Sequence, residues 1–494
     1  MCCRSGNTCP RPTGLGARMT IQSVQRMRTS PSLARLGVCL LAAVILQPSS
    51  ARAQGFGLNE VGTCAVSRAF AATGTPCPDA STIFWNPAAA AELPGKSLSV
   101  GASAIILKGS FRQDSTGRSY PSNINPALPP ALFAAMRFGK GSVGLGVYVP
   151  YGLTSQWNDD FPGRFSALRA ALQTVYIQPN FAYQVTPNWS VGGGPVFGHS
   201  SVDLTQAIDL SQQPAAAGIT FNQLGIAYET EFARAQVHGT ATALGYNLGV
   251  HGKYGPWSIG ARYLSALTFN YDHASAMFSQ TATGLVLPQG NPVSPTGSPV
   301  PLDVLLGAQF TKGGALVSQN ASSTIKHPWQ LQGGVGYTGF ARTTLSVDVA
   351  RLGWSAFNTL PITFSGPASG SSRTLFEGFN DSWSYRFGAE HMIGSWTGRL
   401  GYSYASTPAP DETVTPLLPD MNRRNFSAGV AIPVTSVYKL DIGYLHVNTP
   451  GRRGRIAENP VPPAGATVPL TFAPNTGAYA LKADVISATL NITF

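Results

Sequence analysis

The sequence predicts an all-β fold, a transmembrane antiparallel β-barrel of fourteen strands that follows a small N-terminal segment. Three observations predict this fold. Only 11% of the 494 residues are charged, against roughly 25% in an ordinary soluble protein. Long stretches alternate apolar and polar residues, which gives each strand one apolar face. The connections between these stretches are alternately short and long, as they are in outer-membrane barrels.

Residues 1–53 have the features of a leader with a signal peptide. They contain seven arginines and no lysine or acidic residue, so the rest of the chain holds 26 basic and 22 acidic residues. That near balance argues against nucleic acid as a partner. The apolar run 36–46 is too short to span a bilayer, and Ala51-Arg52-Ala53 is a small-x-small cleavage site, which predicts a mature chain from Gln54. The candidate start residues are Met1, Met19 and Met27.

Two cysteines, Cys64 and Cys77, remain after this leader. Because the periplasm is oxidising, two cysteines of an exported chain can form a disulfide. The alternative is a pair of inert thiols. We expect no metal site, since two cysteines without nearby histidines provide too few ligands.

Residues 54–96 do not alternate like a strand, and their richness in Ala, Gly, Pro and Thr predicts a small compact segment. The barrel is expected over residues 97–494. In its last stretch, Ile486, Leu490 and Phe494 share one face, while Ser487 and Asn491 share the other. The expected strand centres are residues 102, 135, 146, 178, 194, 247, 264, 332, 347, 386, 400, 428, 442 and 487.

The connections predict which end of the barrel faces the periplasm. Short turns are expected at residues 139–141, 186–189, 255–257, 339–342, 394–396 and 433–437. Long outer loops are expected at residues 109–130, 153–171, 204–240, 273–326, 355–380, 407–423 and 450–476. The short turns carry four aromatic residues, Trp189, Trp257, Trp396 and Tyr438. They favour an interfacial aromatic girdle on the periplasmic side, and the alternative is packing of the turns against a core.

Several motifs resemble those of FadL-type proteins and occur in the same order. They are Gly55-Phe56-Gly57-Leu58-Asn59-Glu60, Thr82-Ile83-Phe84-Trp85-Asn86-Pro87-Ala88, Val149-Pro150-Tyr151-Gly152-Leu153, Gly163-Arg164-Phe165, Ile177-Gln178-Pro179-Asn180-Phe181-Ala182-Tyr183, Arg399-Leu400-Gly401-Tyr402 and Leu418-Pro419-Asp420. The resemblance covers nearly all of residues 54–494. It implies a monomeric fourteen-stranded barrel in the outer membrane of a Gram-negative bacterium, with residues 54–96 as a hatch in the lumen and no cofactor.

The resemblance also implies a function, the uptake of hydrophobic small molecules. Long-chain fatty acids are the expected ligands, and aromatic hydrocarbons of the toluene type are the alternative. In the family scheme the outer loops capture the ligand, a pocket against the hatch binds it, and it leaves sideways through a gap at the third strand. The other expected partners are outer-membrane lipid, lipopolysaccharide and the barrel-assembly machinery, which would engage the strand that ends at Phe494.

The candidate site residues follow from these motifs. The ligand and hatch candidates are Phe56, Leu58, Asn86, Pro87 and Ala88. The candidates for an opening at the third strand are Gly144, Gly146 and Pro150, because Gly bends a strand and Pro cannot donate to its ladder. Arg164 is a candidate contact for a carboxylate head group, and pairing with Asp159 or Asp160 is the alternative.

Other functions compete with transport of apolar molecules. Apolar residues on the long loops, among them Phe221, Leu224, Ile226, Leu287 and Leu306, form either a binding surface or the packing of each loop on its neighbours. A general porin would need neither an N-terminal plug nor apolar loops. An outer-membrane enzyme would need a nucleophile beside a placed base, and the sequence has no Gly-x-Ser-x-Gly motif. We therefore expect a transporter and not an enzyme.

Overall fold

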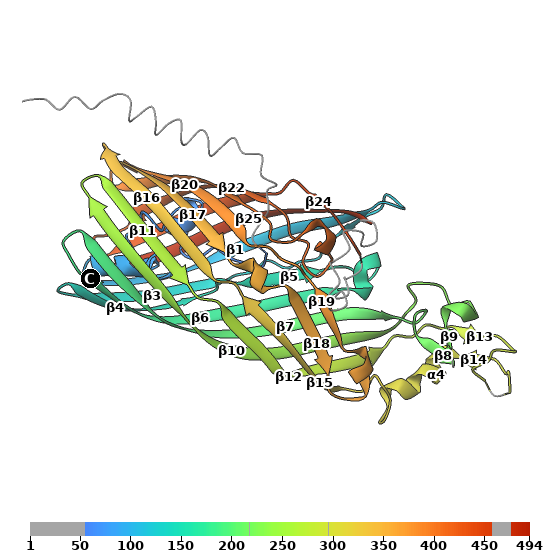
Figure 1. Ribbon diagram of the computed structural model, residues 1–494. Helices are drawn as coiled ribbons and strands as arrows, with labels where there is room; N and C mark the ends of the chain where they lie inside the picture. The colour runs from blue at the N-terminus through green and yellow to red at the C-terminus, as the bar shows by residue number, and fades with distance from the viewer. Residues whose placement is uncertain (1–54, 217, 295, 457–475) are drawn as a thin grey trace, which may run out of the picture. The chain divides into compact units, whose positions relative to one another are not determined.

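Antiparallel β-strands form the wall of the molecule (Figure 1). The structure, a computed structural model, describes residues 55–216, 218–294, 296–456 and 476–494. The expected leader and its cleavage site lie outside the described residues. Each wall strand pairs with its neighbours in the chain, and β25 returns to pair with β1, from Ser97 opposite Thr493 to Gln113 opposite Gly477. The barrel is therefore closed.

Fourteen strands make this wall, which confirms the predicted number, and five of them are divided into two pieces. In chain order they are β1 (Lys96–Gln113), β3 (Pro130–Phe138), β4 (Gly141–Tyr148) with β5 (Gly152–Gln156), β6 (Arg169–Gln184), β7 (Trp189–Asp209), β10 (Glu231–Tyr254), β11 (Trp257–Leu264) with β12 (Leu267–Gln280), β15 (Gln319–His327) with β16 (Gln330–Phe340), β17 (Thr343–Leu352) with β18 (Thr359–Phe364), β19 (Arg373–Phe376) with β20 (Ser382–Ile393), β21 (Trp396–Ala405), β22 (Arg423–Pro433), β23 (Tyr438–Asn448) and β25 (Gly477–Thr493). The tenth wall strand in chain order consists of β19 and β20, which are separated by residues 377–381.

Short elements complete the described chain. The strands among them are β2 (Ser119–Pro121), β8 (Pro214–Ala216), β9 (Ile219–Thr220), β13 (Val286–Leu287), β14 (Val300–Pro301) and β24 (Arg452–Gly454). The helices are α2 (Thr63–Ser67), α3 (Thr82–Trp85), η1 (Pro87–Glu92), η2 (Pro162–Phe165), η3 (Asn222–Leu224), α4 (Leu302–Gly307), η4 (Ala308–Phe310), η5 (Trp354–Ala356), η6 (Pro367–Ser371) and η7 (Asp411–Thr413). No helix of the described residues is long and apolar enough to cross a membrane.

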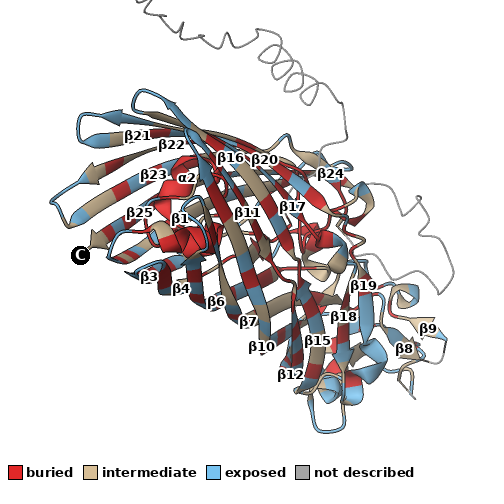
Figure 2. Cartoon of the chain, turned by 60° about the vertical axis from the view of Figure 1, so that its left-hand side comes forward, coloured by how far each residue is buried: buried red, intermediate tan, exposed pale blue. Residues whose placement is uncertain are grey.

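The two faces of each wall strand differ in the way the sequence predicts. On β17, Val347 and Val349 are exposed, whereas Ser346 and Asp348 between and beside them are buried. The same alternation of exposed and buried residues follows the other wall strands (Figure 2). An outward apolar face meets lipid without cost, and an inward polar face can form hydrogen bonds. The alternation thus decides which side of every strand faces the lumen.

The strands extend further outward than the sequence predicted. The loops expected at residues 204–240 and 273–326 are shorter, because β7 continues to Asp209, β10 starts at Glu231 and β15 starts at Gln319. The outward face needs to be apolar only where it meets lipid. Beyond that level both faces can be polar, so the alternation that marks a strand in the sequence is lost.

The short turns join strands at the end of the barrel where the chain terminates. Trp257, Trp396 and Tyr438 are exposed there. Trp189 packs against Tyr254 of the neighbouring turn, with 5.8 Å between ring centroids. Exposed aromatic rings at the strand ends favour the girdle interpretation over packing against a core.

Residues 55–95, which we call the inner segment, lie inside the ring of strands (Figure 2). They include α2, α3 and η1, and most of their side chains are buried. The inner segment contacts wall strands on different sides of the ring: the hydroxyl of Thr63 lies 2.7 Å from that of Ser487, and Asn247 donates to the carbonyl of Phe84 over 3.2 Å. It therefore fills the lumen between β25 and β10.

Candidate functional site

The third wall strand is interrupted between β4 and β5. The ladder between β3 and β4 ends where Leu132 lies opposite Val147. The next backbone hydrogen bond between these neighbours runs from the N–H of Asn123 to the carbonyl of Gln156, over 2.8 Å. Among the described residues, no backbone hydrogen bond joins the two sides in between. The wall therefore has a gap at this point.

Prolines border the gap on both sides. Pro126, Pro129 and Pro130 lie on the side of β3, and Pro150 lies on the side of β4. Proline has no N–H to donate to a neighbouring strand. These residues explain locally why the ladder does not continue, and Pro150 lies where the sequence placed an opening.

The two glycines that were predicted for the opening lie elsewhere. Gly144 is opposite Ala135 on one side and Asn180 on the other, and Gly146 is also paired on both sides. A Cβ on Gly144 would come within 2.6 Å of the side chain of Ile83. Both glycines are in the intact ladder, and they leave room for the inner segment to approach the wall. The prediction of an opening at Gly144 and Gly146 is thus corrected.

The start of the inner segment takes the place of the missing strand partner. Gly57 forms a β-bridge with Tyr151. The N–H of Leu58 donates to the carbonyl of Pro150, and the N–H of Gly152 donates to the carbonyl of Phe56, both over 2.9 Å. Strand three bends inward at this point, since Tyr151 is fully buried.

A cavity of about 540 Å³ lies at the gap, and we call it the lateral cavity. Leu58 and Glu60 of the inner segment border it on one side. Both edges of the gap border it as well, through residues 124–130 and 152–155. The lateral cavity therefore connects the start of the inner segment with the opening in the wall.

Phe56 lies in a group of aromatic rings that we call the aromatic cage. Its ring centroid is 4.6 Å from that of Trp354, 5.2 Å from Phe357, 5.6 Å from His327 and 6.1 Å from Tyr151. All four contacts have steep interplanar angles, an arrangement that aromatic pairs favour. The cage anchors the start of the inner segment by one side chain.

A second, smaller cavity of about 60 Å³ is lined in part by Phe56. Leu153, Leu172 and Leu418 line both this cavity and the lateral cavity. The two cavities are therefore neighbours, and these leucines are shared between their linings.

Asp420 and Arg423 hold the backbone of Gly55, and we call this group the terminal clasp. The N–H of Gly55 donates to a carboxylate oxygen of Asp420 over 3.2 Å. The guanidinium of Arg423 donates to the carbonyl of Gly55 over 3.0 Å and lies 3.4 Å from Asp420. Gly55 has a φ of 55°, and a Cβ there would lie 2.8 Å from the ring of Trp354. Only glycine fits both conditions.

Two carboxyl groups at this place have raised pKa values. Burial raises the pKa of Asp420 above its usual range, against the opposing effect of Arg423. Burial likewise raises the pKa of Glu60. Removing a carboxylate from water disfavours its charged form. Both groups border the lateral cavity together with Arg423, so this part of its lining is ionisable.

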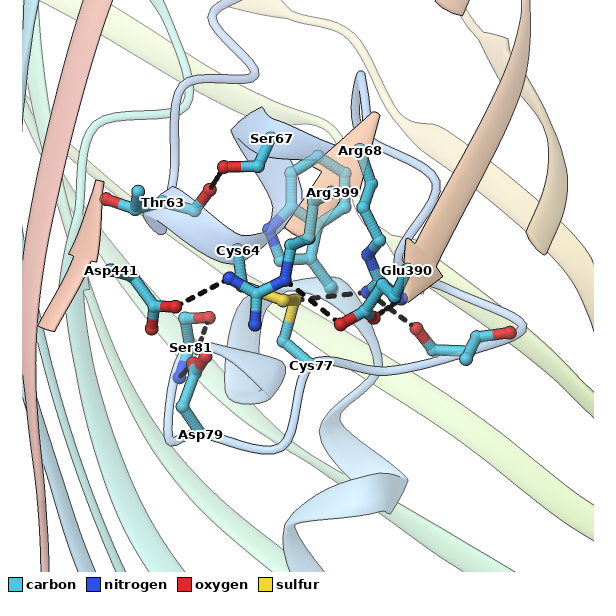
Figure 3. Close-up of a disulfide and its surroundings, with 12 residues drawn as sticks. Thr63, Cys64, Ser67, Arg68, Cys77, Asp79, Ser81, Glu390, Arg399 and Asp441 are labelled. Atoms are coloured by element: carbon cyan, nitrogen blue, oxygen red, sulfur yellow. Dashed lines mark hydrogen bonds and ion pairs between the residues drawn. A yellow bond between two sulfur atoms is a disulfide. The ribbon is translucent and has the colours of Figure 1, made fainter. Parts of the chain in front are cut away.

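The rest of the inner segment is fixed by a disulfide between Cys64 and Cys77 (Figure 3). The bond joins α2 to the extended stretch that follows it. Arg68 donates to the carbonyl of Thr75 over 2.8 Å and to the sulfur of Cys77 over 3.1 Å. Asp79 lies close to both sulfurs, but neither sulfur is a free thiolate, which a metal site would require.

A chain of buried ion pairs joins the same region to the wall (Figure 3). Arg68 pairs with Glu390 over 2.6 Å, Glu390 pairs with Arg399 over 3.0 Å, and Arg399 pairs with Asp441 over 2.5 Å. On another side of the lumen, Asp348 accepts hydrogen bonds from the backbone of residues 73 and 74. The body of the inner segment is therefore attached at several points, and its start is held by fewer contacts.

The sequence profile of the family described as "Outer membrane protein transport protein (OMPP1/FadL/TodX)" matches residues 44–494. The chain belongs to this family. Its curated relatives include the long-chain fatty acid transport protein of Escherichia coli K12, which is 26% identical over 85% of this chain and 93% of that protein. The 47 kDa outer membrane protein of Pasteurella multocida is 25% identical over 86% of this chain and 93% of that protein.

Solved structures share the fold. The crystal structure of a Pseudomonas aeruginosa FadL homologue has a TM-score of 0.70 and 18% identity, and it covers 89% of this chain and 100% of that one. The Pseudomonas putida toluene transporter TodX has a TM-score of 0.61 and 16% identity, with the same coverage. As a member of the FadL family, the chain is an outer-membrane protein of a Gram-negative bacterium that transports hydrophobic compounds and is not an enzyme.

The Asn-Pro-Ala motif that resembles the FadL family shapes the inner segment. Asn86 is buried at the start of η1, and its side chain donates to the carbonyls of Thr73 and Val250 over 3.0 and 3.1 Å. Pro87 is the first residue of η1, where its missing N–H costs nothing. Neither Asn86, Pro87 nor Ala88 borders either cavity, so the motif positions the inner segment without lining the space for a ligand.

Arg164, the predicted head-group contact, borders neither cavity. Its guanidinium lies 3.5 Å from Glu231 and donates to the carbonyl of Glu229 over 2.9 Å. The alternative pairing with Asp159 or Asp160 is wrong, since Asp159 pairs with Arg234 and Asp160 pairs with Arg118. Arg164 holds outer loops together, and Arg423 is the arginine that borders the lateral cavity.

The apolar residues of the long outer loops pack mainly on one another. The buried members of this group are Leu210, Phe221, Ile226, Phe232, Leu287, Leu302 and Leu306. Val286 and Val304 remain exposed on the same loops. Much of the apolar pattern in these loops is therefore internal packing, and a smaller exposed part is left for a ligand.

Sequence reasoning missed three features of this site. The proline-rich run 126–130 is visible in the sequence and could have indicated the second edge of the gap. Asp420 was noticed only as part of a resemblance, and the aromatic cage joins residues from distant parts of the chain. No sequence pattern connects Phe56 with Trp354 or Phe357.

Proposed function

We propose that this protein carries long-chain fatty acids across the outer membrane. The outer loops would capture the ligand, the lateral cavity would bind it, and the gap in the third strand would release it sideways. The inner segment would act as the hatch of this path. One observation carries the proposal: an apolar cavity joins the start of the inner segment to an opening in the wall.

The size of the lateral cavity supports a fatty acid. A cavity of about 150 Å³ is enough for benzene, and the lateral cavity has about 540 Å³. An acyl chain would use this larger volume and remove more apolar surface from water. Arg423, at the border of the cavity, could interact with a carboxylate head group.

The curated relatives named long-chain fatty acid transport proteins support the same ligand class. Aromatic hydrocarbons are the second candidate, since one observation favours them. The aromatic cage around Phe56 has the ring contacts that a toluene-like molecule would make if Phe56 withdrew.

Uptake by whole cells tests the proposal. Cells with and without the protein are given labelled oleate, labelled toluene or labelled sucrose. We expect uptake of oleate that depends on the protein, with no entry of sucrose. Uptake of toluene but not oleate would favour the second candidate, and entry of sucrose without either would indicate a general porin and overturn the proposal.

Arg423→Gln refines this test, because a charge-assisted hydrogen bond contributes about 1.5–3 kcal/mol. We expect oleate binding by the purified variant to weaken about tenfold or more, with toluene binding unchanged. Arg164→Gln is the matched control, since Arg164 borders neither cavity. Equal oleate binding by both variants would contradict a head-group contact at Arg423.

A further inference from the structure

Three basic side chains form one row on the outward face of the wall. Arg424 of β22 lies opposite Asn448 of β23, Asn448 lies opposite Lys482 of β25, and Lys482 lies opposite Lys108 of β1. Arg424, Lys482 and Lys108 are exposed. We call these three basic residues, together with Asn448, the basic row. Since neighbouring strands are about 4.8 Å apart, the basic row is roughly 15 Å long.

The basic row lies at the outer edge of the apolar belt. Two positions closer to the periplasm, the outward residues on the same strands include Phe426 and Ile106, and the next row contains Tyr444 and Ile486. Lys108 is the twelfth residue after Lys96, the first residue of β1. At about 3.3 Å per residue and a tilt of about 40°, this places Lys108 roughly 30 Å above the periplasmic end, just beyond an apolar band of about 25 Å.

The charges of the basic row are compensated only in part within the described part of the chain, by the electrostatic attraction between Lys108 and Asp484. Neither Lys108, Lys482 nor Arg424 forms an ion pair with a described residue, whereas Arg452 and Arg453 near the same end of the barrel pair with Asp411 and Asp114. Like charges directly opposite each other on neighbouring strands destabilise a sheet. An anion that binds between Lys108 and Lys482 would remove this repulsion.

One carboxylate lies close to the row, and it is already engaged. Asp484 of β25 accepts hydrogen bonds from the hydroxyl of Tyr444 over 2.6 Å and from the ring of His446 over 2.8 Å. It lies one outward position nearer to the periplasm than Lys482. Asp484 therefore marks the inner boundary of the row and leaves its outer side positive.

We propose that the basic row binds the phosphate groups of lipopolysaccharide in the outer leaflet. Phosphates are the anions found at this level of the outer membrane, and lysine and arginine bind them by charge-assisted hydrogen bonds. The amide of Asn448 can donate a further hydrogen bond between the cations. Lys108 and Arg424 border neither cavity, whereas Lys482 also borders the lateral cavity.

Binding of lipopolysaccharide to the purified, folded full chain in detergent micelles tests this inference. The probe is fluorescently labelled deep-rough lipopolysaccharide, compared with the same molecule after removal of its phosphates. The variant replaces Lys108, Lys482 and Arg424 by Gln. Because each basic residue near an anionic surface strengthens the attraction, we expect its affinity for the phosphorylated probe to fall about tenfold or more.

A matched control removes the same charge elsewhere. Arg137→Gln and Lys140→Gln at the β3–β4 turn, combined with Lys326→Gln on β15, should keep the affinity of the unchanged protein. Because Lys482 also borders the lateral cavity, the measurement is lipid binding and not uptake. The heat-modifiable migration of each variant on gels verifies that it is folded.

Two results would overturn the inference. One is an equal loss of affinity in the basic-row variant and the control, which would indicate attraction by net charge alone. The other is equal binding of the phosphorylated and dephosphorylated probes by the unchanged protein. A loss confined to the basic-row variant and to the phosphorylated probe supports the site.

Discussion

At the scale of single residues, the terminal clasp shows how one carboxyl group can position the start of the chain. Asp420 binds the backbone N–H of Gly55 while it lies beside Arg423. Its burial makes the charged form costly, and Arg423 and the hydrogen bonds offset only part of that cost. Asp420 therefore holds the inner segment through a group that takes up a proton more readily than an exposed aspartate.

The pH dependence of stability should reveal this. Because the pKa of Asp420 is raised in the folded protein, the folded state binds more protons than the unfolded chain between that pKa and about 3.9. The unfolding free energy contributed by Asp420 therefore rises as the pH falls through this range. We expect Asp420→Asn to lose this rise, as measured by urea unfolding in micelles at several pH values.

Asp303 provides a control of opposite sign. Hydrogen bonds from Thr283 hold the pKa of Asp303 below its usual range. Its stabilising contribution is therefore present above about pH 3.9 and is lost as the pH falls through the lowered folded pKa. Asp303→Asn should reduce stability at neutral pH, and the difference should shrink on acidification. The same pH slope in Asp420→Asn and in the unchanged protein would contradict the role of Asp420.

At the scale of elements, the third strand and the start of the inner segment form one unit. The bent stretch at residues 149–152 has lost β3 as its partner and has gained residues 56–58. Movement of the inner segment would expose the gap from inside without disturbing the ladders on either side. The rest of the inner segment can stay in place, held by its disulfide and ion pairs.

A covalent link between these two elements tests whether the start of the inner segment must move. Leu58 and Pro150 are opposite each other around the Gly57–Tyr151 bridge. Antiparallel partners have Cα atoms about 4.5–5.5 Å apart, a distance that suits a disulfide. We expect the double variant Leu58→Cys, Pro150→Cys to lose most oleate uptake when oxidised and to regain it after reduction.

Reduction also acts on the native pair Cys64 and Cys77, so the unchanged protein is treated with the same reductant. The single variants Leu58→Cys and Pro150→Cys show the effect of each substitution alone. Full uptake by the oxidised double variant, with its new bond verified by mass spectrometry, would mean that the inner segment transports ligand without leaving the third strand.

At the scale of the whole molecule, the inner segment and the wall share a buried charge network. Glu390 lies between Arg68 and Arg399, and all three are largely buried. Removing one member of a buried ion pair leaves its partner uncompensated, at a cost of about 3–5 kcal/mol. We expect Glu390→Gln to lower the free energy of unfolding by about 3 kcal/mol, as measured by urea unfolding in micelles.

The pair of Arg351, which is exposed, and Asp381, which is partly exposed, gives a control on the same wall, with 2.9 Å between the charged groups. Exposed pairs contribute at most about 1 kcal/mol, so Asp381→Asn should change stability little. An equally small effect of Glu390→Gln would show that the network does not stabilise the folded state. The hydrogen bonds of the inner segment to wall residues such as Asp348 and Ser487 would then be its main attachments.

The wall of this molecule could be predicted from the sequence because every strand that crosses the lipid needs apolar residues on its outward face. Alternation at Leu345 to Val349 reports directly which side chains face the membrane, and all fourteen expected strand centres lie in wall strands. The outer loops lie beyond the lipid, so their sequences need not alternate in this way. Their strands β13 and β14 and the helix α4 had to be found in the structure.

The candidate site could be predicted only in part. Pro150 and Phe56 belong to motifs that resemble a family, and both lie at the gap or beside it. The clasp joins Gly55 to residue 420, and the cage joins Phe56 to residue 354. Contacts at such separations follow from the closed barrel as a whole, and no local periodicity encodes them.

The gap in the wall has a consequence for a crowded membrane. Closing a barrel normally removes every free strand edge, and free edges recruit strands from other molecules. Here one edge of the opening contains Pro126, Pro129 and Pro130, which offer no donors. The opposite edge is turned inward and is occupied by residues 56–58. In the part of the chain that the structure describes, the gap therefore presents no free strand edge with which a neighbouring barrel could pair.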